Sequence, residues 1–320
     1  MRVLFAGSPQ VALPSLRTLV AGPHEVVGVL TRPDAPAGRG RGLRPSPVAA
    51  AATDAGLRVL RPARVGDPDA LADIAALAPD CAVVVAYGAL LPQRALDAVP
   101  GGWVNLHFSL LPRWRGAAPV QHAVFAGDTA TGVTTFRIVR ELDAGPVYES
   151  APAELGPRET AGDVLTRLAR MGTGVLARTL DRVAAGEEPV RQPSDGVTLA
   201  PKVTVADAQV DWSIDAELVD QRVRGCTPAP GAWTTFRGQR VKLGPVQGST
   251  AGPGSTAVQG PAAVLEPGEL AVGAGGSRVE VGTGSGAVTL STVQPAGRPA
   301  TEAAAWARGA RPVAGERFGT

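Results

Sequence analysis

Short apolar runs alternate with amphipathic segments through the first half of the chain. The run at 2–7 ends in glycine and predicts a buried strand, and the run at 25–31 predicts the next strand. Between them, Leu13, Leu16 and Leu19 recur at helical spacing, which predicts a helix. Parallel strands need a crossover of this kind, so the pattern predicts a β-α-β unit.

The same alternation continues to about residue 186. The uniformly apolar run "CAVVVAYG" at 81–88 is typical of a central strand in a parallel sheet. The pattern therefore predicts an α/β domain. Further strands are predicted at 57–60, 103–108 and 131–139. The first helix spans 12–22, and further helices are predicted at 48–56, 68–78, 118–127 and 161–186. The last of these is expected to be interrupted at Gly172 and Gly174.

The pattern changes near residue 187. Residues 187–208 have little periodicity and indicate a linker. Short strand-like pieces with Gly- and Pro-rich turns follow, and "RGQ" and "GSG" are typical of hairpins, which predicts a small barrel or sandwich. Residues 247–260 have the composition of a flexible low-complexity insert. We expect a catalytic domain at 1–188, a linker at 189–207 and a second domain at 208–320.

Composition supports a soluble protein of two domains. The chain has 320 residues, of which 44% are hydrophobic and 19% charged, and no apolar run approaches the roughly 20 residues of a membrane span. The first residues lack the apolar core of a signal peptide. Cys81 and Cys226 form neither a metal-ligand pair nor a disulfide framework. We therefore expect a cytoplasmic protein without contact to membranes, and the lack of an interface pattern favours a monomer.

The charge distribution is more informative than the net charge of +2. Residues 32–64 contain seven Arg and two Asp, and 32–47 form a long Pro-, Gly- and Arg-rich stretch without strand or helix periodicity. Such a stretch is most often a solvated loop, and otherwise a phosphate-binding surface. The turn "AGSPQ" after the first strand lacks the G-x-G-x-x-G spacing of a dinucleotide site, so it indicates an ordinary turn.

A polar constellation lies at the end of the strand predicted at 103–108. Asn105 and His107 are two positions apart, so their side chains share one face of that strand. Asp143, in "LDAG", follows another strand and is expected in the same crevice. Asn can donate to a developing oxyanion, His can accept a proton near neutral pH, and Asp can fix the tautomer of His. Without an activated Ser or Cys, this set suits direct attack of an amine or water on a carbonyl.

Simpler interpretations stand beside this one. An isolated Asn-x-His is more often structural than catalytic, and the spacing of His24, His107 and His122 offers no metal-ligand pattern, so no metal is expected.

The stretch "NLHFSLLPRWRGAAP" with the later "LDAG" resembles the formyltransferases that use 10-formyltetrahydrofolate. This resemblance implies a Rossmann-like fold, 10-formyltetrahydrofolate as formyl donor, and catalytic roles for Asn105, His107 and Asp143. The "VVAYGALLP" segment resembles the pterin-pocket wall of that family. The implied folate contacts are Ser109, Leu110, Leu111, Pro112, Ala86, Tyr87 and Gly88.

The basic stretch at 32–47 resembles the loop inserted in the methionyl-tRNA branch of this family, and "VRGCTPAPGAW" and "LSTVQPAGR" resemble its C-terminal domain. The resemblance implies an OB-like β-barrel after the linker and methionyl initiator tRNA as acceptor and partner. It implies tRNA contacts at Arg39, Arg41, Arg44 and Lys202. Phe108 stands where the family commonly has Gly, which narrows the pocket.

Three alternatives stay open. One is a formyltransferase that acts on a small amine such as a sugar nucleotide or glycinamide ribonucleotide. The second is a hydrolase that releases formate from the same folate. The third is a tRNA-binding protein without catalysis, and the Asn-His-Asp set argues against it.

Overall fold

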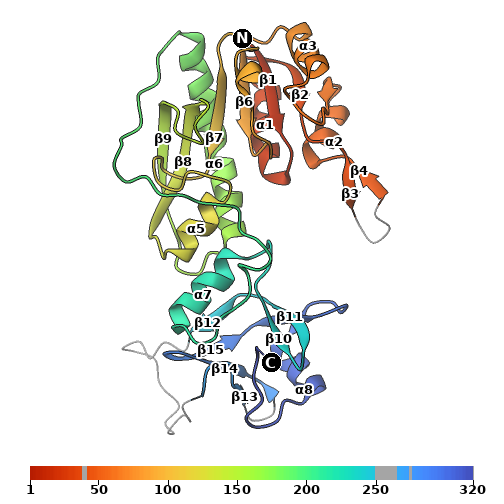
Figure 1. The fold of residues 1–320 in the computed structure, drawn as a ribbon, viewed down its shortest axis with the longest axis vertical. Coiled ribbons are helices and arrows are strands. Elements are labelled where there is room, and N and C mark those ends of the chain that lie inside the picture. The colour runs from red at the N-terminus through yellow and green to blue at the C-terminus, as the bar shows by residue number, and fades with distance from the viewer. Residues whose placement is uncertain (38–41, 249–264, 274–275, 320) are drawn as a thin grey trace. The chain divides into compact units, whose positions relative to one another are not determined.

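The computed structural model describes all residues except 38–41, 249–264, 274–275 and 320 (Figure 1). The expected tRNA contacts Arg39 and Arg41, and nearly all of the 247–260 insert, lie outside the described residues. The chain forms two compact units, one of residues 1–119, 130–154 and 165–201, and one of residues 120–129, 155–164 and 202–320.

The first unit is built on a seven-stranded sheet with the strand order β5-β2-β1-β6-β7-β8-β9. The first five strands in this order are parallel, and β8 and β9 are antiparallel additions beside β7. The predicted α/β class and its parallel sheet are confirmed, whereas β9 was not predicted. The strands are β1 (Arg2–Gly7), β2 (Glu25–Leu30), β5 (Val59–Leu60), β6 (Cys81–Val85), β7 (Trp103–His107), β8 (Ala130–Arg137) and β9 (Val147–Glu154).

Helices cover this sheet, and most of them were predicted within a few residues. Helix α2 (Pro47–Asp54) has two typical start signals. The Ser46 side chain accepts a hydrogen bond from the Ala49 backbone N–H at 3.0 Å, and Pro47 is at the first helical position. The helical elements of the first unit are η1 (Gln10–Ala12), α1 (Leu13–Val20), α2, α3 (Pro68–Ala76), α4 (Gln93–Leu96) and most of α6 (Ala161–Ala184), whereas α5 (Pro119–Phe125) belongs almost wholly to the second unit.

The predicted interruption of α6 is wrong, because this helix is continuous. A Cβ at Gly172 would lie 2.8 Å from the Leu106 side chain of β7, so this glycine allows close approach of helix and sheet. Thr179 of α6 also makes a 2.7 Å hydroxyl hydrogen bond with Thr135 of β8. The glycine therefore serves packing against the sheet that carries the candidate site.

The basic stretch contains regular structure that its composition did not predict. β3 (Ala35–Ala37) and β4 (Gly42–Arg44) pair as an antiparallel hairpin outside the large sheet. Its strands are three residues long and contain Pro and Gly, so they carry no readable alternation. Arg44 is exposed at the end of β4.

The second unit is rich in strands, as predicted. It holds two four-stranded antiparallel sheets, with orders β10-β11-β16-β17 and β12-β15-β14-β13. The hairpins predicted at "RGQ" and "GSG" connect β10 to β11 and β14 to β15. The strands are β10 (Trp233–Phe236), β11 (Gln239–Leu243), β12 (Val246–Gly248), β13 (Leu270–Val272), β14 (Val279–Thr283), β15 (Gly286–Leu290), β16 (Thr292–Pro295) and β17 (Thr301–Glu302).

Two helices of this unit, α7 (Ala216–Gly225) and α8 (Ala303–Ala310), were not predicted. Aromatic rings fill the core beside α8: Phe236 packs edge-on against Trp306 at 5.2 Å, and Phe318 stacks on Trp212 at 5.7 Å. Among the described helices, none is both long and apolar enough to cross a membrane.

Candidate active site

His107 is the last residue of β7 and is 5% exposed. Leu106 points to α6, so Asn105 and His107 face the opposite side of the sheet, as their spacing predicts. Phe136, on the neighbouring β8, meets the His107 ring edge-on at 6.3 Å between ring centroids. Asn105 is half-buried.

A backbone carbonyl fixes the tautomer of His107. Nε2 lies 2.9 Å from the Trp114 oxygen, and a carbonyl can only accept, so Nε2 carries the proton. Nδ1 then presents its lone pair toward Asp143, whose Oδ2 lies 3.9 Å away. The expectation that Asp143 sets the tautomer is therefore wrong in this detail, because Trp114 sets it.

Burial lowers the pKa of His107 below its ordinary value, while the Asp143 carboxylate and the Trp114 carbonyl act in the opposite direction. The imidazole is consequently neutral near pH 7, with Nδ1 free to accept a proton. Once protonated, it would donate toward both Asp143 and Trp114. A proton accepted at Nδ1 would therefore face the Asp143 carboxylate.

Asp143 is held by the backbone of the motif around His107. Its Oδ2 accepts a hydrogen bond from the Gly116 N–H at 2.8 Å. Its own φ of +48° lies in the left-handed region, which residues other than glycine rarely adopt. Two positions on, a Cβ at Gly145 would lie 1.7 Å from the Arg137 carbonyl oxygen. The glycine of "LDAG" is therefore required for this loop to pack against the end of β8.

The Ser-Leu-Leu-Pro turn uses its polar groups internally. Ser109 is fully buried, and its hydroxyl donates to the Arg113 carbonyl at 2.6 Å. Thr134 of β8 donates to the Ser109 carbonyl at 2.8 Å and accepts from the Leu111 N–H at 3.2 Å. Leu110, Leu111 and Pro112 are partly exposed. A ligand on this turn would therefore meet these three residues more readily than the serine hydroxyl.

The expected pterin wall also divides by exposure. Ala86 is partly exposed and Gly88 exposed, both at positive φ, whereas Tyr87 is 2% exposed and belongs to the core beneath. Burial raises the pKa of the Tyr87 hydroxyl. Large apolar side chains that were not selected from the sequence are exposed nearby in the chain: Leu90 at 82% and Leu142 at 54%.

Two cavities adjoin the chain segment that carries Asp143. One of about 570 Å³ has a mixed polar and apolar lining that includes Trp103, at the end of β7 opposite to His107, together with the chain at 137–141. The other, of about 630 Å³, lies among Arg115, the chain at 144–146 and the chain at 191–194. The second cavity reaches the residue after Asp143, but neither cavity is lined by His107 or Asp143.

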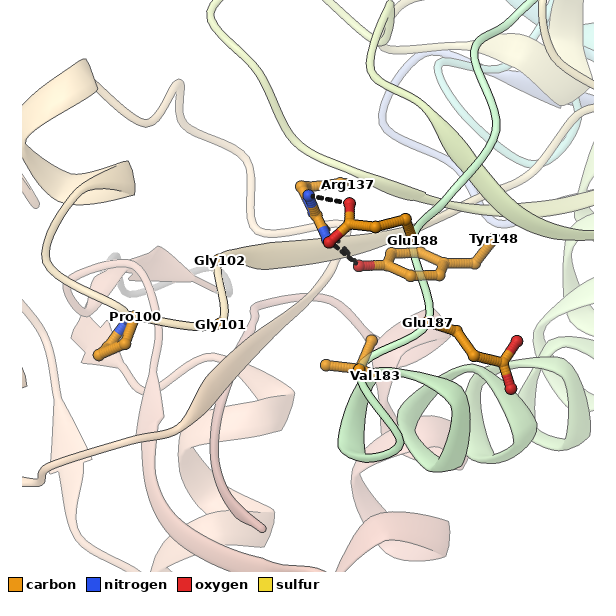
Figure 2. Close-up of a pocket in the computed structure, with 9 residues that line it drawn as sticks. Pro100, Gly101, Gly102, Arg137, Tyr148, Val183, Glu187 and Glu188 are labelled. Carbon is orange, nitrogen blue, oxygen red and sulfur yellow. Dashed lines mark hydrogen bonds and ion pairs between the residues drawn. The ribbon is translucent and has the colours of Figure 1, made fainter.

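A third cavity of about 340 Å³ shares Pro100, Gly102 and Arg137 with the first (Figure 2). There the Arg137 guanidinium donates to the Tyr148 hydroxyl at 2.9 Å and pairs with Glu188 at 3.0 Å. Neither His107 nor Asp143 lines this cavity. We do not assign it to the candidate active site.

The remaining predicted site residues are Arg44 and Lys202, which are both exposed. Arg44 belongs to the first unit and Lys202 to the second. Within the part of the chain that the structure describes, no three His, Cys, Asp or Glu side chains gather as a metal site.

The residues missed from the sequence are mainly backbone donors and acceptors. The Trp114 carbonyl holds His107, the Gly116 N–H holds Asp143, and the Thr134 hydroxyl holds the intervening turn. A Trp-x-Gly sequence carries no signal for such contacts, since they depend on how segments meet in space. Gly116, whose φ is +131°, is the one position whose residue type is a hint.

The mostly parallel sheet and the strand-rich second unit define a class of two-domain α/β proteins, and the His107–Asp143 pair is its candidate acid–base site. Residues 1–180 match the family model described as formyl transferase, and residues 202–311 match that of the formyl transferase C-terminal domain. The chain belongs to the formyl transferase family.

Curated relatives align over the whole length of the chain. A methionyl-tRNA formyltransferase of Streptomyces coelicolor is 57% identical over 321 residues, which cover 100% of both chains. That of Thermobifida fusca is 57% identical over 320 residues, covering 100% of this chain and 99% of the relative.

Solved structures share the fold at low identity. A methionyl-tRNA formyltransferase from Clostridium thermocellum has a TM-score of 0.58 at 12% identity, covering 80% of this chain and 95% of that one. An N-formyltransferase from Helicobacter canadensis, in complex with folinic acid and dTDP-3-aminofucose, has a TM-score of 0.64 at 11% identity, covering 92% and 98%.

Proposed function

We propose that this chain transfers the formyl group of 10-formyltetrahydrofolate to the α-amino group of methionyl initiator tRNA, in support of translation initiation. The observation that carries the proposal is the 57% identity over the full length to proteins named methionyl-tRNA formyltransferase. The buried His107–Asp143 pair supplies the proton acceptor that such a transfer needs.

In the proposed reaction, the neutral methionyl amine attacks the formyl carbon. A C–N bond forms there, the bond from the formyl carbon to N10 of the folate breaks, and tetrahydrofolate leaves. Asn105 donates to the oxyanion of the tetrahedral intermediate. His107 accepts the proton of the amine at Nδ1, and the resulting imidazolium is stabilised by Asp143 and by the Trp114 carbonyl. A proton then passes to N10, either from His107 or through water held by Asp143.

We place the folate against the turn at 110–112 and the Ala86–Gly88 segment. The placement rests on exposure: Leu110, Leu111 and Pro112 are partly exposed, and the exposed Leu90 and Leu142 offer apolar contact. Ser109 and Tyr87 would contribute through their backbone and through packing, since their side chains are buried.

We assign catalysis to residues 1–188, a connecting role to 189–207, and tRNA contact to an OB-like domain at 208–320. Arg44, at the end of β4, would contact the tRNA backbone, and Lys202 would add charge from the second unit. Contacts of Arg39 and Arg41 with tRNA remain part of the proposal. We expect the protein to act as a monomer in the cytoplasm, where its two buried cysteines stay reduced.

The direct test is steady-state formyl transfer to methionyl initiator tRNA, with N-formylmethionine on the tRNA identified by mass spectrometry. Formation of that product in proportion to released tetrahydrofolate supports the proposal. Release of formate at the same rate with and without tRNA would instead identify a hydrolase. Binding of tRNA without any turnover would identify a non-catalytic tRNA-binding protein.

Arg44→Ala is expected to weaken the use of tRNA while leaving the use of the folate unchanged. Loss of one phosphate contact should raise the KM for tRNA about 3- to 10-fold at low salt and reduce its salt dependence by about one charge. The measurement is KM for both substrates across a salt series. Arg17→Ala, an exposed arginine of α1, is the matched control. An equal rise in the folate KM would contradict the assignment of Arg44 to tRNA.

Gly145→Ala is expected to disable the enzyme through backbone displacement. The added methyl would overlap the Arg137 carbonyl, so the loop must shift and Asp143 must leave its place beside His107. We expect kcat to fall by at least about 10-fold, since misplacement of a reacting group by about 1 Å costs that much or more. Gly174→Ala on α6, where only the Arg178 tip lies within reach at 3.6 Å, is the control. Full activity of Gly145→Ala would show that the loop tolerates the shift.

A further inference from the structure

Gln192 lies in the aperiodic segment that follows α6 and makes four hydrogen bonds with its side-chain amide. Nε2 donates to the carbonyl oxygens of Asp143 and Gly145, at 2.8 Å each. Oε1 accepts from the Arg115 guanidinium, from Nε at 3.1 Å and from Nη2 at 2.7 Å. One amide therefore joins the loop of Asp143 to the motif that contains His107.

The orientation of this amide is determined by its partners. Two carbonyls require the NH₂ group, and the guanidinium requires the oxygen, so the opposite orientation would leave every contact without a donor–acceptor match. A glutamate in this place could still accept from Arg115 but could not donate to the two carbonyls. The residue type is thus matched to both sides of the contact.

The segment that carries Gln192 is itself fixed to the first unit on both sides. Before it, Val190 and Val147 exchange backbone hydrogen bonds of 2.7 and 2.8 Å. After it, Thr198 accepts from the Arg115 N–H at 2.9 Å with its carbonyl, and its hydroxyl accepts from the Trp114 N–H at 2.8 Å. Gln192 is therefore anchored where it can hold the two loops at a set distance.

The two loops that Gln192 joins contain Trp114 and Asp143, which both face His107. Trp114, whose carbonyl holds His107, directly precedes Arg115, and Asp143 is bonded by Gln192 through its own carbonyl. The left-handed φ of Asp143 is less favourable for an aspartate than for a glycine, so contacts from its surroundings help to hold it. Gln192 supplies that support from a part of the chain remote in sequence.

We propose that Gln192 is a positioning residue for formyl transfer, which holds Asp143 and the Trp114–Arg115 turn in the arrangement that His107 requires. The inference rests on the proposed function, because it assigns Gln192 a role through Asp143 and His107. Its effect should lie on the chemical step, so kcat should fall while the KM values for folate and tRNA change little.

A double-mutant cycle with Asp143→Asn tests this role. We expect Gln192→Ala to lower kcat about 10-fold or more in the wild-type background, and less than about 2-fold further when Asp143 is already Asn. Gln192→Glu should resemble Gln192→Ala, since it keeps the Arg115 contact and loses both carbonyl contacts. Asp195→Ala, an exposed residue of the same segment, is the matched control and should keep the wild-type kcat.

Equal fold losses in the two backgrounds, or a wild-type kcat for Gln192→Ala, would overturn the proposal. Wild-type activity of Gln192→Glu would likewise overturn it, because only the Arg115 contact would then matter. Thermal unfolding of each variant separates lost positioning from lost folding. If the unmutated enzyme formylates another amine instead of methionyl-tRNA, the proposed function fails, yet the cycle can be run with that acceptor and still judges Gln192.

Discussion

His107→Ala is expected to lower kcat for formyl transfer about 10²- to 10⁴-fold, the usual contribution of a general base. The imidazole is neutral, buried and oriented through Nε2, so only Nδ1 can accept the proton of the amine. Removal leaves Asn105 and the bound geometry to support a residual rate. Single-turnover kinetics with saturating folate would measure the chemical step directly.

The controls for this prediction separate chemistry from folding. His107→Asn retains a side chain that can donate to the Trp114 carbonyl, and it should be as slow as His107→Ala while unfolding closer to the wild type. His122→Ala changes a histidine of α5 that packs edge-on against Phe125. It should keep the wild-type rate. A normal rate for folded His107→Ala would remove His107 from the mechanism.

Asp143→Asn is expected to lower kcat about 10²-fold, since it removes the charge that stabilises the imidazolium in a buried site. The amide oxygen can still accept from the Gly116 N–H, so the loop should hold its place. Asp73→Asn, whose carboxylate pairs with Arg58 at the surface, is the control for a lost negative charge. A wild-type kcat for Asp143→Asn would show that the carboxylate is not needed.

The pH profile gives a second measure of the same pair. Burial lowers the pKa of His107 and the Asp143 carboxylate raises it, so kcat/KM should be lost only below the ordinary range of histidine. Without the carboxylate this pKa should fall further, and the acidic limb of Asp143→Asn should move to lower pH. A shift to higher pH would contradict the electrostatic role of Asp143.

The sequence predicts the elements that follow simple periodicity. The strands β1, β6 and β7 and the helices α1 to α3 bury one apolar stripe or run each, so the alternation was readable. Helix α7 was missed because its buried face contains Asp220 and Arg224, which form a 2.6 Å ion pair and interrupt the apolar pattern. A search for apolar periodicity does not detect a buried helix face that contains a charged pair.

The site was predictable to the same extent. The i, i+2 spacing placed Asn105 and His107 on one face, and the position of "LDAG" after a strand placed Asp143 near them. The residues that support this site could not be predicted from the sequence. Trp114 and Gly116 act through backbone groups, and Gln192 acts through its amide in a segment without periodicity. Such contacts arise only when remote segments meet.

One competition experiment tests the central claim most directly. The enzyme would receive 10-formyltetrahydrofolate with an isotope-labelled formyl group and an equal mixture of methionyl initiator tRNA and a sugar nucleotide bearing a free amine. The partition of label gives the ratio of the two kcat/KM values. We predict label on the methionine of the tRNA, dependent on His107 and nearly absent from the sugar. Label on the sugar, or released as formate while the tRNA stays unformylated, would contradict the account.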